Sequence, residues 1–117
     1  MSDCVFCKIV KKEIPTEFEW NDDEIVAFND IKPIAPVHIL IVPKKHIESL
    51  GKTKNEDVEL LGKIQRIAGK LAKEKGIGNA FRLLTLSGKG AGQTVLHLHY
   101  HLIGGWKDKA PEIEAVK

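Results

Sequence analysis

Three of the five histidines stand at every second position of one short segment, His97, His99 and His101 in "HLHYHLIGG" (97–105). In a β-strand, alternate side chains share a face, so the three imidazoles would form a row. The opposite face would carry the residues between and after them: Leu98, Tyr100 and Leu102. Imidazole binds metals and carries protons near neutral pH, so this row is the first candidate for chemistry.

The row admits three interpretations. The histidines could stand by chance on a solvated strand face. They could form a three-histidine zinc site, since H-x-H can chelate. Alternatively, one imidazole attacks phosphorus while its neighbours orient it or handle protons. The sequence has no clustered Asp/Glu set that would indicate Mg²⁺, which disfavours kinase-like chemistry.

A glycine-rich stretch, "SGKGAG" (87–92), directly precedes the histidine segment. It is not a P-loop, because Gln93 stands where that motif needs glycine. The stretch could be a mobile surface turn. It could also let backbone N–H groups approach an anion, and so hold a phosphate beside His99.

Cys4 and Cys7 form a C-x-x-C pair, the spacing of half a zinc site. These are the only two cysteines in the chain, so a closed tetrahedral site would need histidines, and His46 lies outside the row. A redox pair and two unliganded buried thiols are the alternatives. The redox role is weaker because no βαβ pattern surrounds the pair.

The remaining pattern predicts the elements that must position these residues. A capping box at Thr53 and Glu56 and apolar residues at three-to-four spacing predict one long helix that ends near Gly76. We expect an α+β domain over 1–117, an antiparallel sheet with this helix on one face, and a polar tail at 107–117 that could be disordered. The other predicted elements are a short helix at 4–12 and strands at 17–21, 24–30, 37–43 and 81–87, followed by the histidine strand.

Composition narrows the setting. The net charge of +2 is too small to indicate nucleic acid or an anionic membrane as a partner. No apolar stretch approaches the ~20 residues that span a bilayer, and "MSDCVFCKIV" lacks the features of a signal peptide. We therefore expect a cytoplasmic protein.

The segment "QTVLHLHYHLI" resembles the signature of the histidine-triad (HIT) superfamily, H-φ-H-φ-H-φ-φ with φ hydrophobic, after Gly-Gln-Ser/Thr-Val. The blocks "FCKIVKKEIP", "IVAFNDIKPIAPVHILIVPKKHI" and "LIGG" extend the likeness over nearly the whole chain. Gly104-Gly105 resembles the Hint branch, the nucleoside phosphoramidases, rather than the fragile-histidine-triad branch, which continues with Pro-Arg. The resemblance implies a HIT-like fold. That fold has a five-stranded antiparallel sheet, one long and one short helix, and two protomers joined into a continuous sheet.

The resemblance also implies roles. His99 matches the nucleophile that becomes nucleotidylated, and His101 the histidine that contacts phosphate and assists proton transfer. The supporting histidines are His97 and His38, although a lone histidine in an apolar strand is usually a core residue. The other matched residues are Asp30 for the ribose, Phe6, Phe28 and Ile31 for the base pocket, and Gln93 and Thr94, next to Gly92 of the glycine loop, for the phosphate or leaving group. From the residues alone, Asp30 could be a turn residue and the two phenylalanines core.

Some bacterial members resemble this chain in binding zinc through the C-x-x-C pair, the histidine at 46 and the first triad histidine. That implies a structural Zn²⁺ on Cys4, Cys7, His46 and His97, with no metal required for the chemistry. The implied activity is hydrolysis of the P–N bond of purine nucleoside 5′-phosphoramidates through a nucleotidyl-His99 intermediate.

The alternatives to this activity are a dinucleoside-polyphosphate hydrolase and a nucleotide-binding regulatory module with incidental turnover. One departure stands out: Leu86 occupies a position where Hint relatives commonly carry Asn near the ribose, so either Thr85 or Ser87 substitutes or the contact is missing. Trp106 could pack near the partner protomer's site or be an ordinary surface residue.

Overall fold

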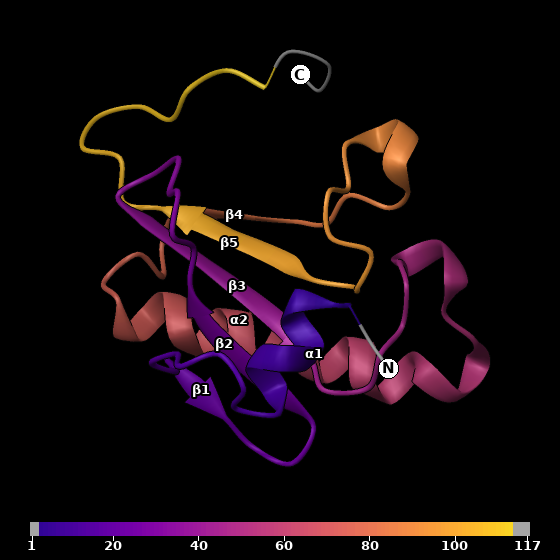
Figure 1. Ribbon diagram of the computed structural model, residues 1–117. Helices are drawn as coiled ribbons and strands as arrows, with labels where there is room; N and C mark the ends of the chain where they lie inside the picture. The colour runs from indigo at the N-terminus through magenta and orange to yellow at the C-terminus, as the bar shows by residue number, and fades with distance from the viewer. Residues whose placement is uncertain (1–2, 114–117) are drawn as a thin grey trace.

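A five-stranded antiparallel sheet with a helix on each face forms the body of the protein in the computed structural model, which describes residues 3–113 (Figure 1). The strand order is β1-β2-β3-β5-β4, so the last strand along the chain lies inside the sheet. The α+β prediction is confirmed. In chain order the elements are α1 (Val5–Val10), β1 (Trp20–Asn21), β2 (Ile25–Asn29), β3 (Val37–Pro43), α2 (Val58–Glu74), β4 (Phe81–Leu84) and β5 (Tyr100–Gly104), with 3₁₀ turns at Leu50–Lys52, Asn55–Asp57 and Lys89–Ala91.

The two faces of the sheet carry separate apolar clusters because alternate residues of each strand point to opposite sides. The larger cluster lies under α2 and includes the residues predicted to face away from the histidines: Leu98, Tyr100 and Leu102. The smaller cluster packs Phe6 and Ile9 of α1 against β2 and β3. The two clusters lie on opposite faces of the sheet, with α1 in front of it and α2 behind it in Figure 1.

The histidine segment is only partly a strand, which corrects our prediction. β5 begins at Tyr100, so His97 and His99 precede it. Continuing the β3–β5 register would place Leu98 opposite Pro43, which has no N–H to offer the ladder. Instead, Leu98 donates its N–H to the carbonyl of Ile47, 2.6 Å away. β1 and β4 are likewise shorter than the strands predicted at 17–21 and 81–87.

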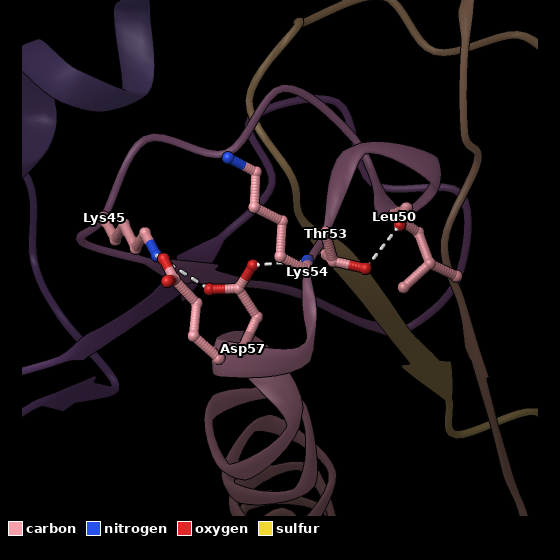
Figure 2. Close-up of polar contacts among 6 residues, drawn as sticks. Lys45, Leu50, Thr53, Lys54 and Asp57 are labelled. Carbon is pink, nitrogen blue, oxygen red and sulfur yellow. Dashed lines mark hydrogen bonds and ion pairs between the residues drawn. The ribbon is translucent and has the colours of Figure 1, made fainter.

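The start of α2 differs by one residue from the predicted capping box (Figure 2). The Asp57 carboxylate, not that of Glu56, reaches back to accept the backbone N–H of Lys54 at 2.8 Å. Thr53 donates its hydroxyl to the carbonyl of Leu50 instead of accepting a helical N–H. A 3₁₀ turn precedes the α-helix, and the helix then runs for 17 residues, close to the five turns predicted.

Gly104 and Gly105 end β5 for local reasons. A Cβ on Gly104 would lie 2.9 Å from Cδ1 of Ile77 and 3.1 Å from the carbonyl oxygen of Ala80. Gly105 has φ of +91°, a conformation that favours glycine. The pair that marks the resemblance is thus required by the turn out of the sheet.

The described part of the tail contacts the sheet edge. The Arg82 guanidinium of β4 lies 5.0 Å from the Trp106 ring centroid and donates to the carbonyl of Pro111. Disorder over 107–117 stays a prediction, and residues 114–117 lie outside the described part. Within residues 3–113, no helix has the length and apolar character needed to cross a membrane.

Candidate active site and metal-ligand cluster

A pocket of about 630 Å³ lies between α1 and the sheet. Its lining includes seven of the residues that the resemblance matched to catalysis or nucleotide binding: Phe6, Phe28, Asp30, Ile31, Thr94, His99 and His101. The pocket therefore combines apolar walls with two carboxylates, those of Glu17 and Asp30, and two imidazoles, the composition expected of a small-molecule site.

His99 presents one nitrogen to this pocket. Its Nδ1 lies 2.7 Å from the carbonyl oxygen of His97, so Nδ1 carries the proton that is donated there. In neutral His99 the Nε2 atom then holds a lone pair. The Nε2 atom of His99 has no hydrogen-bond partner. Since every fully buried side-chain nitrogen or oxygen of the described residues has one, this Nε2 is not fully buried and is open to the pocket. The edge-on ring of Phe6, with centroids 5.0 Å apart, restrains the imidazole.

Burial lowers the pKa of His99, and the hydrogen bond to the His97 carbonyl opposes that shift only in part. The ordinary pKa of an imidazole is ~6.5. The lower pKa keeps the imidazole neutral over a wider pH range, and the neutral form is the nucleophilic one.

A second imidazole pair lies beside His99. Nδ1 of His101 is 2.9 Å from Nε2 of His38, and that Nε2 is 3.4 Å from Oδ2 of Asp30. The backbone N–H of Ile34 points at the other nitrogen of His38, with Ile34 N 3.2 Å from Nδ1. Burial, with smaller effects from neighbouring imidazoles, lowers the pKa of His101 to about 4, and burial also lowers the pKa of His38. The sequence pattern offered no signal for the Ile34 contact, because it uses only the backbone.

The four predicted metal ligands come together at the edge of the pocket. Nδ1 of His97 lies 3.1 Å from Nδ1 of His46 and 3.3 Å and 3.6 Å from the sulfurs of Cys4 and Cys7. The four ligand atoms all lie within 4.8 Å of one another. His97 donates its Nε2–H to the carbonyl of Pro43 at 2.8 Å, which leaves the Nδ1 lone pair facing the cluster. The cluster could bind a metal ion.

The segment that carries His46 is fixed on both sides of the histidine. Before it, Lys45 forms an ion pair of 2.8 Å with Asp57 at the start of α2, which Figure 2 shows. After it, the Ile47 carbonyl accepts the N–H of Leu98. The segment just before β5 and the start of the long helix together therefore hold His46 against His97.

Gln93 is placed differently from its predicted role at the phosphate. It is 4% exposed, does not line the pocket, and its amide nitrogen donates to the carbonyls of Glu48 and Val95. Its Oε1 accepts the N–H of Gly88. Gly92 also lies outside the pocket lining and has φ of +100°, so the glycine loop depends on it for its shape. In this conformation Gln93 braces the glycine loop and the His46 segment.

The two candidates to replace the missing asparagine are both engaged elsewhere. Thr85 donates its hydroxyl to the carbonyl of His99 at 2.7 Å, and Ser87 accepts the N–H of Gly51 at 2.9 Å. Leu86 is partly exposed. The described lining of the pocket includes none of residues 85–87.

Comparisons with known proteins identify the family of the chain. Residues 3–112 match the family described as scavenger mRNA decapping enzyme C-terminal binding. Protein HitA of Neisseria gonorrhoeae is 45% identical over 104 residues, which cover 89% of this chain and 97% of that protein. A HIT family hydrolase of Legionella pneumophila superposes with a TM-score of 0.88 at 44% identity, covering 93% of this chain and 98% of that one. A HIT family hydrolase of Clostridium thermocellum superposes with a TM-score of 0.89 at 44% identity, covering 97% and 98%.

The chain therefore belongs to the histidine-triad superfamily. The five-stranded α+β fold that the sequence indicated is the fold of this superfamily.

Proposed function

We propose that the protein hydrolyses the P–N bond of purine nucleoside 5′-phosphoramidates through a covalent nucleotidyl-His99 intermediate. The observation that carries the proposal is the unprotonated Nε2 of His99, held open to a nucleotide-sized pocket by the hydrogen bond from Nδ1 to the His97 carbonyl. The two solved HIT structures named above are described as hydrolases, which supports hydrolysis as the reaction class.

The nucleoside would occupy the apolar end of the pocket. Phe6 and Phe28 meet edge-on with centroids 5.8 Å apart and offer faces and edges to a base, and Ile31 is 92% exposed beside them. Asp30 lies at the pocket wall as an acceptor for ribose hydroxyls. The α-phosphorus of such a nucleotide would then lie near His99 and His101.

In the first chemical step, the Nε2 lone pair of His99 forms a bond to phosphorus and the P–N bond breaks with its electron pair on nitrogen. The amine leaves after taking up one proton from solvent. In the second step, water attacks phosphorus, its proton returns to solvent, and the N–P bond breaks with its electron pair on His99. We assign the transfer of both protons, the one to the amine and the one from the water, to the edge of the His101 ring that faces the pocket. The full cycle consumes one water and no net proton.

We further propose that the cluster of Cys4, Cys7, His46 and His97 binds Zn²⁺. Tetrahedral Zn²⁺ with bonds of about 2.0–2.3 Å implies N···N edges of roughly 3.3 Å and N···S edges of roughly 3.6 Å. The observed separations of 3.1–3.6 Å fit these edges. Four protein ligands leave no open position, so the ion would fasten α1 to the sheet.

The protein would act as a homodimer in the cytoplasm. β4 is an edge strand of the sheet, with Phe81 37% exposed at its start. Pairing of two such edges would extend the sheet and cover both. Trp106, next to β4 through Arg82, would then lie near the partner.

The test is to mix the purified protein with an adenosine phosphoramidate, quench within one turnover, and measure the intact mass before peptide mapping. We expect an adenylyl adduct on His99. His99→Asn should lose the adduct and at least ~10³-fold of the rate, as for removal of a nucleophile. His101→Asn is the control, because it should slow turnover but still form the adduct on His99.

Other outcomes point to other mechanisms. Product without an adduct would favour attack by an activated water. Nucleotide binding without turnover would favour the regulatory module, and faster cleavage of a diadenosine polyphosphate than of the phosphoramidate would favour the dinucleoside-polyphosphate hydrolase.

A further inference from the structure

Asp30, His38 and His101 form a second cluster of metal-type ligands. As in the first cluster, their ligand atoms lie within 4.8 Å of one another. Spacing alone would therefore allow a metal ion at this wall of the pocket. The hydrogen bonds around the cluster indicate a different use.

The proton of His38 can be located from the backbone. The N–H of Ile34 points at Nδ1 of His38, with the two nitrogens 3.2 Å apart. An N–H can only donate to a lone pair, so Nδ1 is unprotonated. Neutral His38 therefore carries its proton on Nε2.

This proton determines the state of the next ring. Nε2 of His38 lies 2.9 Å from Nδ1 of His101, which must then accept the hydrogen bond. Neutral His101 carries its own proton on Nε2, the nitrogen left for the pocket that the ring lines. Asp30 Oδ2, at 3.4 Å, is a second acceptor for the same His38 proton and leaves this assignment unchanged.

The loop that supplies the Ile34 N–H is itself fixed. Asp30 donates its backbone N–H to the carbonyl of His38 at 2.9 Å, and its Oδ1 accepts the N–H of Lys32 at 2.8 Å. The Ile34 side chain is 73% exposed, so it takes little part in this arrangement. The relevant group is the main-chain N–H.

We propose that the backbone N–H of Ile34 is a positioning group that, through His38, fixes the proton of His101 on Nε2, directed at the substrate. The cluster is then a line of hydrogen bonds and not a metal site, since the His38 nitrogen that faces it carries a proton. The role of the Nε2–H as a donor to a phosphoryl oxygen or to the departing nitrogen rests on the proposed function. The tautomers of His38 and His101 follow from the hydrogen bonds alone and do not depend on that function.

The first test is ¹⁵N NMR of the full-length protein labelled at histidine, at pH 7.5, with resonances assigned by single-histidine variants. We expect His38 and His101 to be protonated at Nε2 and His99 at Nδ1. An Nδ1 proton on His38 or His101 would overturn the proposal. This readout needs no substrate, so it decides the proposal even if the phosphoramidase activity is absent.

The second test removes the donor. Ile34→Pro deletes the N–H, whereas Ile34→Ala keeps it and is the matched control. We expect mixed tautomers at His38 and His101 in the proline variant only, with kcat about tenfold to a hundredfold below that of Ile34→Ala and KM nearly unchanged. Unaltered tautomers in folded Ile34→Pro would refute the role.

A third comparison covers the case in which Ile34→Pro does not fold. The amide nitrogen of Gln can donate to His101 from the place of His38 Nε2, whereas Leu cannot. His38→Gln should keep the proton of His101 on Nε2, and His38→Leu should lose this preference. The same tautomer distribution in both variants would contradict the relay.

Discussion

Two clusters of potential metal ligands lie close to His99, and the backbone contacts of their histidines are opposite in kind. In the first cluster, the carbonyl of Pro43 accepts a hydrogen bond from the Nε2–H of His97, so the lone pair of Nδ1 faces the two cysteines. In the second cluster, the N–H of Ile34 donates to the lone pair on Nδ1 of His38, so the Nε2–H of His38 faces His101. One backbone atom thus decides whether a histidine offers a lone pair or a proton.

His99 follows the rule of the first cluster although it belongs to neither. The Nδ1–H of His99 also donates to a backbone carbonyl, that of His97, and the lone pair on Nε2 faces the pocket. A lone pair can serve a metal ion or an electrophilic phosphorus equally well. The surroundings decide which: two sulfurs and an imidazole at His97, an open apolar pocket at His99.

The largest expected effect concerns metal affinity. Cys4→Ser should weaken Zn²⁺ or Co²⁺ binding by more than the ~10–100-fold typical of losing an outer-shell partner, because it replaces a ligand atom. Asp30→Asn in the second cluster should leave the affinity unchanged. Calorimetric or Co²⁺-absorption titration of both variants measures this. Equal losses in the two would mean that the comparison is wrong.

The second expected effect is on thermal stability. A metal ion at hundredfold excess over its Kd stabilises the folded state by about 2.7 kcal/mol. For a chain of this size that raises Tm by roughly 10 °C. Chelation should reverse the rise in the wild type, while Cys4→Ser should show little change with metal or chelator. A full metal-dependent shift in Cys4→Ser would place the ion elsewhere.

The smallest expected effect is a pH dependence of stability from the second cluster. Because the folded pKa of His101 is about 4, below the ordinary 6.5, the unfolded chain binds more protons between these values. The stability that neutral His101 contributes to the folded state is complete above pH 6.5 and is lost as the pH falls towards 4. Urea unfolding at pH 7.5, 6 and 5 should show this loss of stability. We would measure it in Cys4→Ser, in which pH-dependent release of a metal ion does not contribute.

The matched variant for this measurement is Cys4→Ser with His101→Gln. As the pH falls, the unfolding free energy of this double variant should decrease less steeply than that of Cys4→Ser. The difference between the two slopes should be at most about 1.4 kcal/mol per pH unit. Identical slopes in the two proteins would show that His101 does not titrate in this window.

Side-chain patterns in the sequence were enough to predict the sheet and the long helix, and the family resemblance predicted the grouping of Cys4, Cys7, His46 and His97. What they missed involves the backbone. The start of β5 depends on Pro43 lying opposite Leu98, which follows only from the register. The N–H of Ile34 and the carbonyl of His97 leave no trace in residue types.

The predicted capping box shifted by one residue and the role matched to Gln93 stays a prediction, because several residues can fill one role. Thr53 with Glu56 had capping spacing, but Asp57 serves Lys54 and also binds Lys45, so the helix starts one residue later (Figure 2). Gln93 was matched to the phosphate, yet three internal hydrogen bonds occupy its amide. Spacing identifies candidates for a hydrogen bond, and packing selects among them.

The position of α1 has a consequence for the order in which the chain assembles during synthesis. Six residues are too few for a stable isolated helix. Its partner His97 lies 93 residues after Cys4, so at about 5–20 residues per second the ribosome needs roughly 5–20 s to supply it. β5, which β4 and β3 both require, arrives at the same time. The apolar side of α1 can thus meet β2 and β3 early, whereas its contact with His97 and the histidine wall of the pocket form only when nearly all of the described residues have been translated.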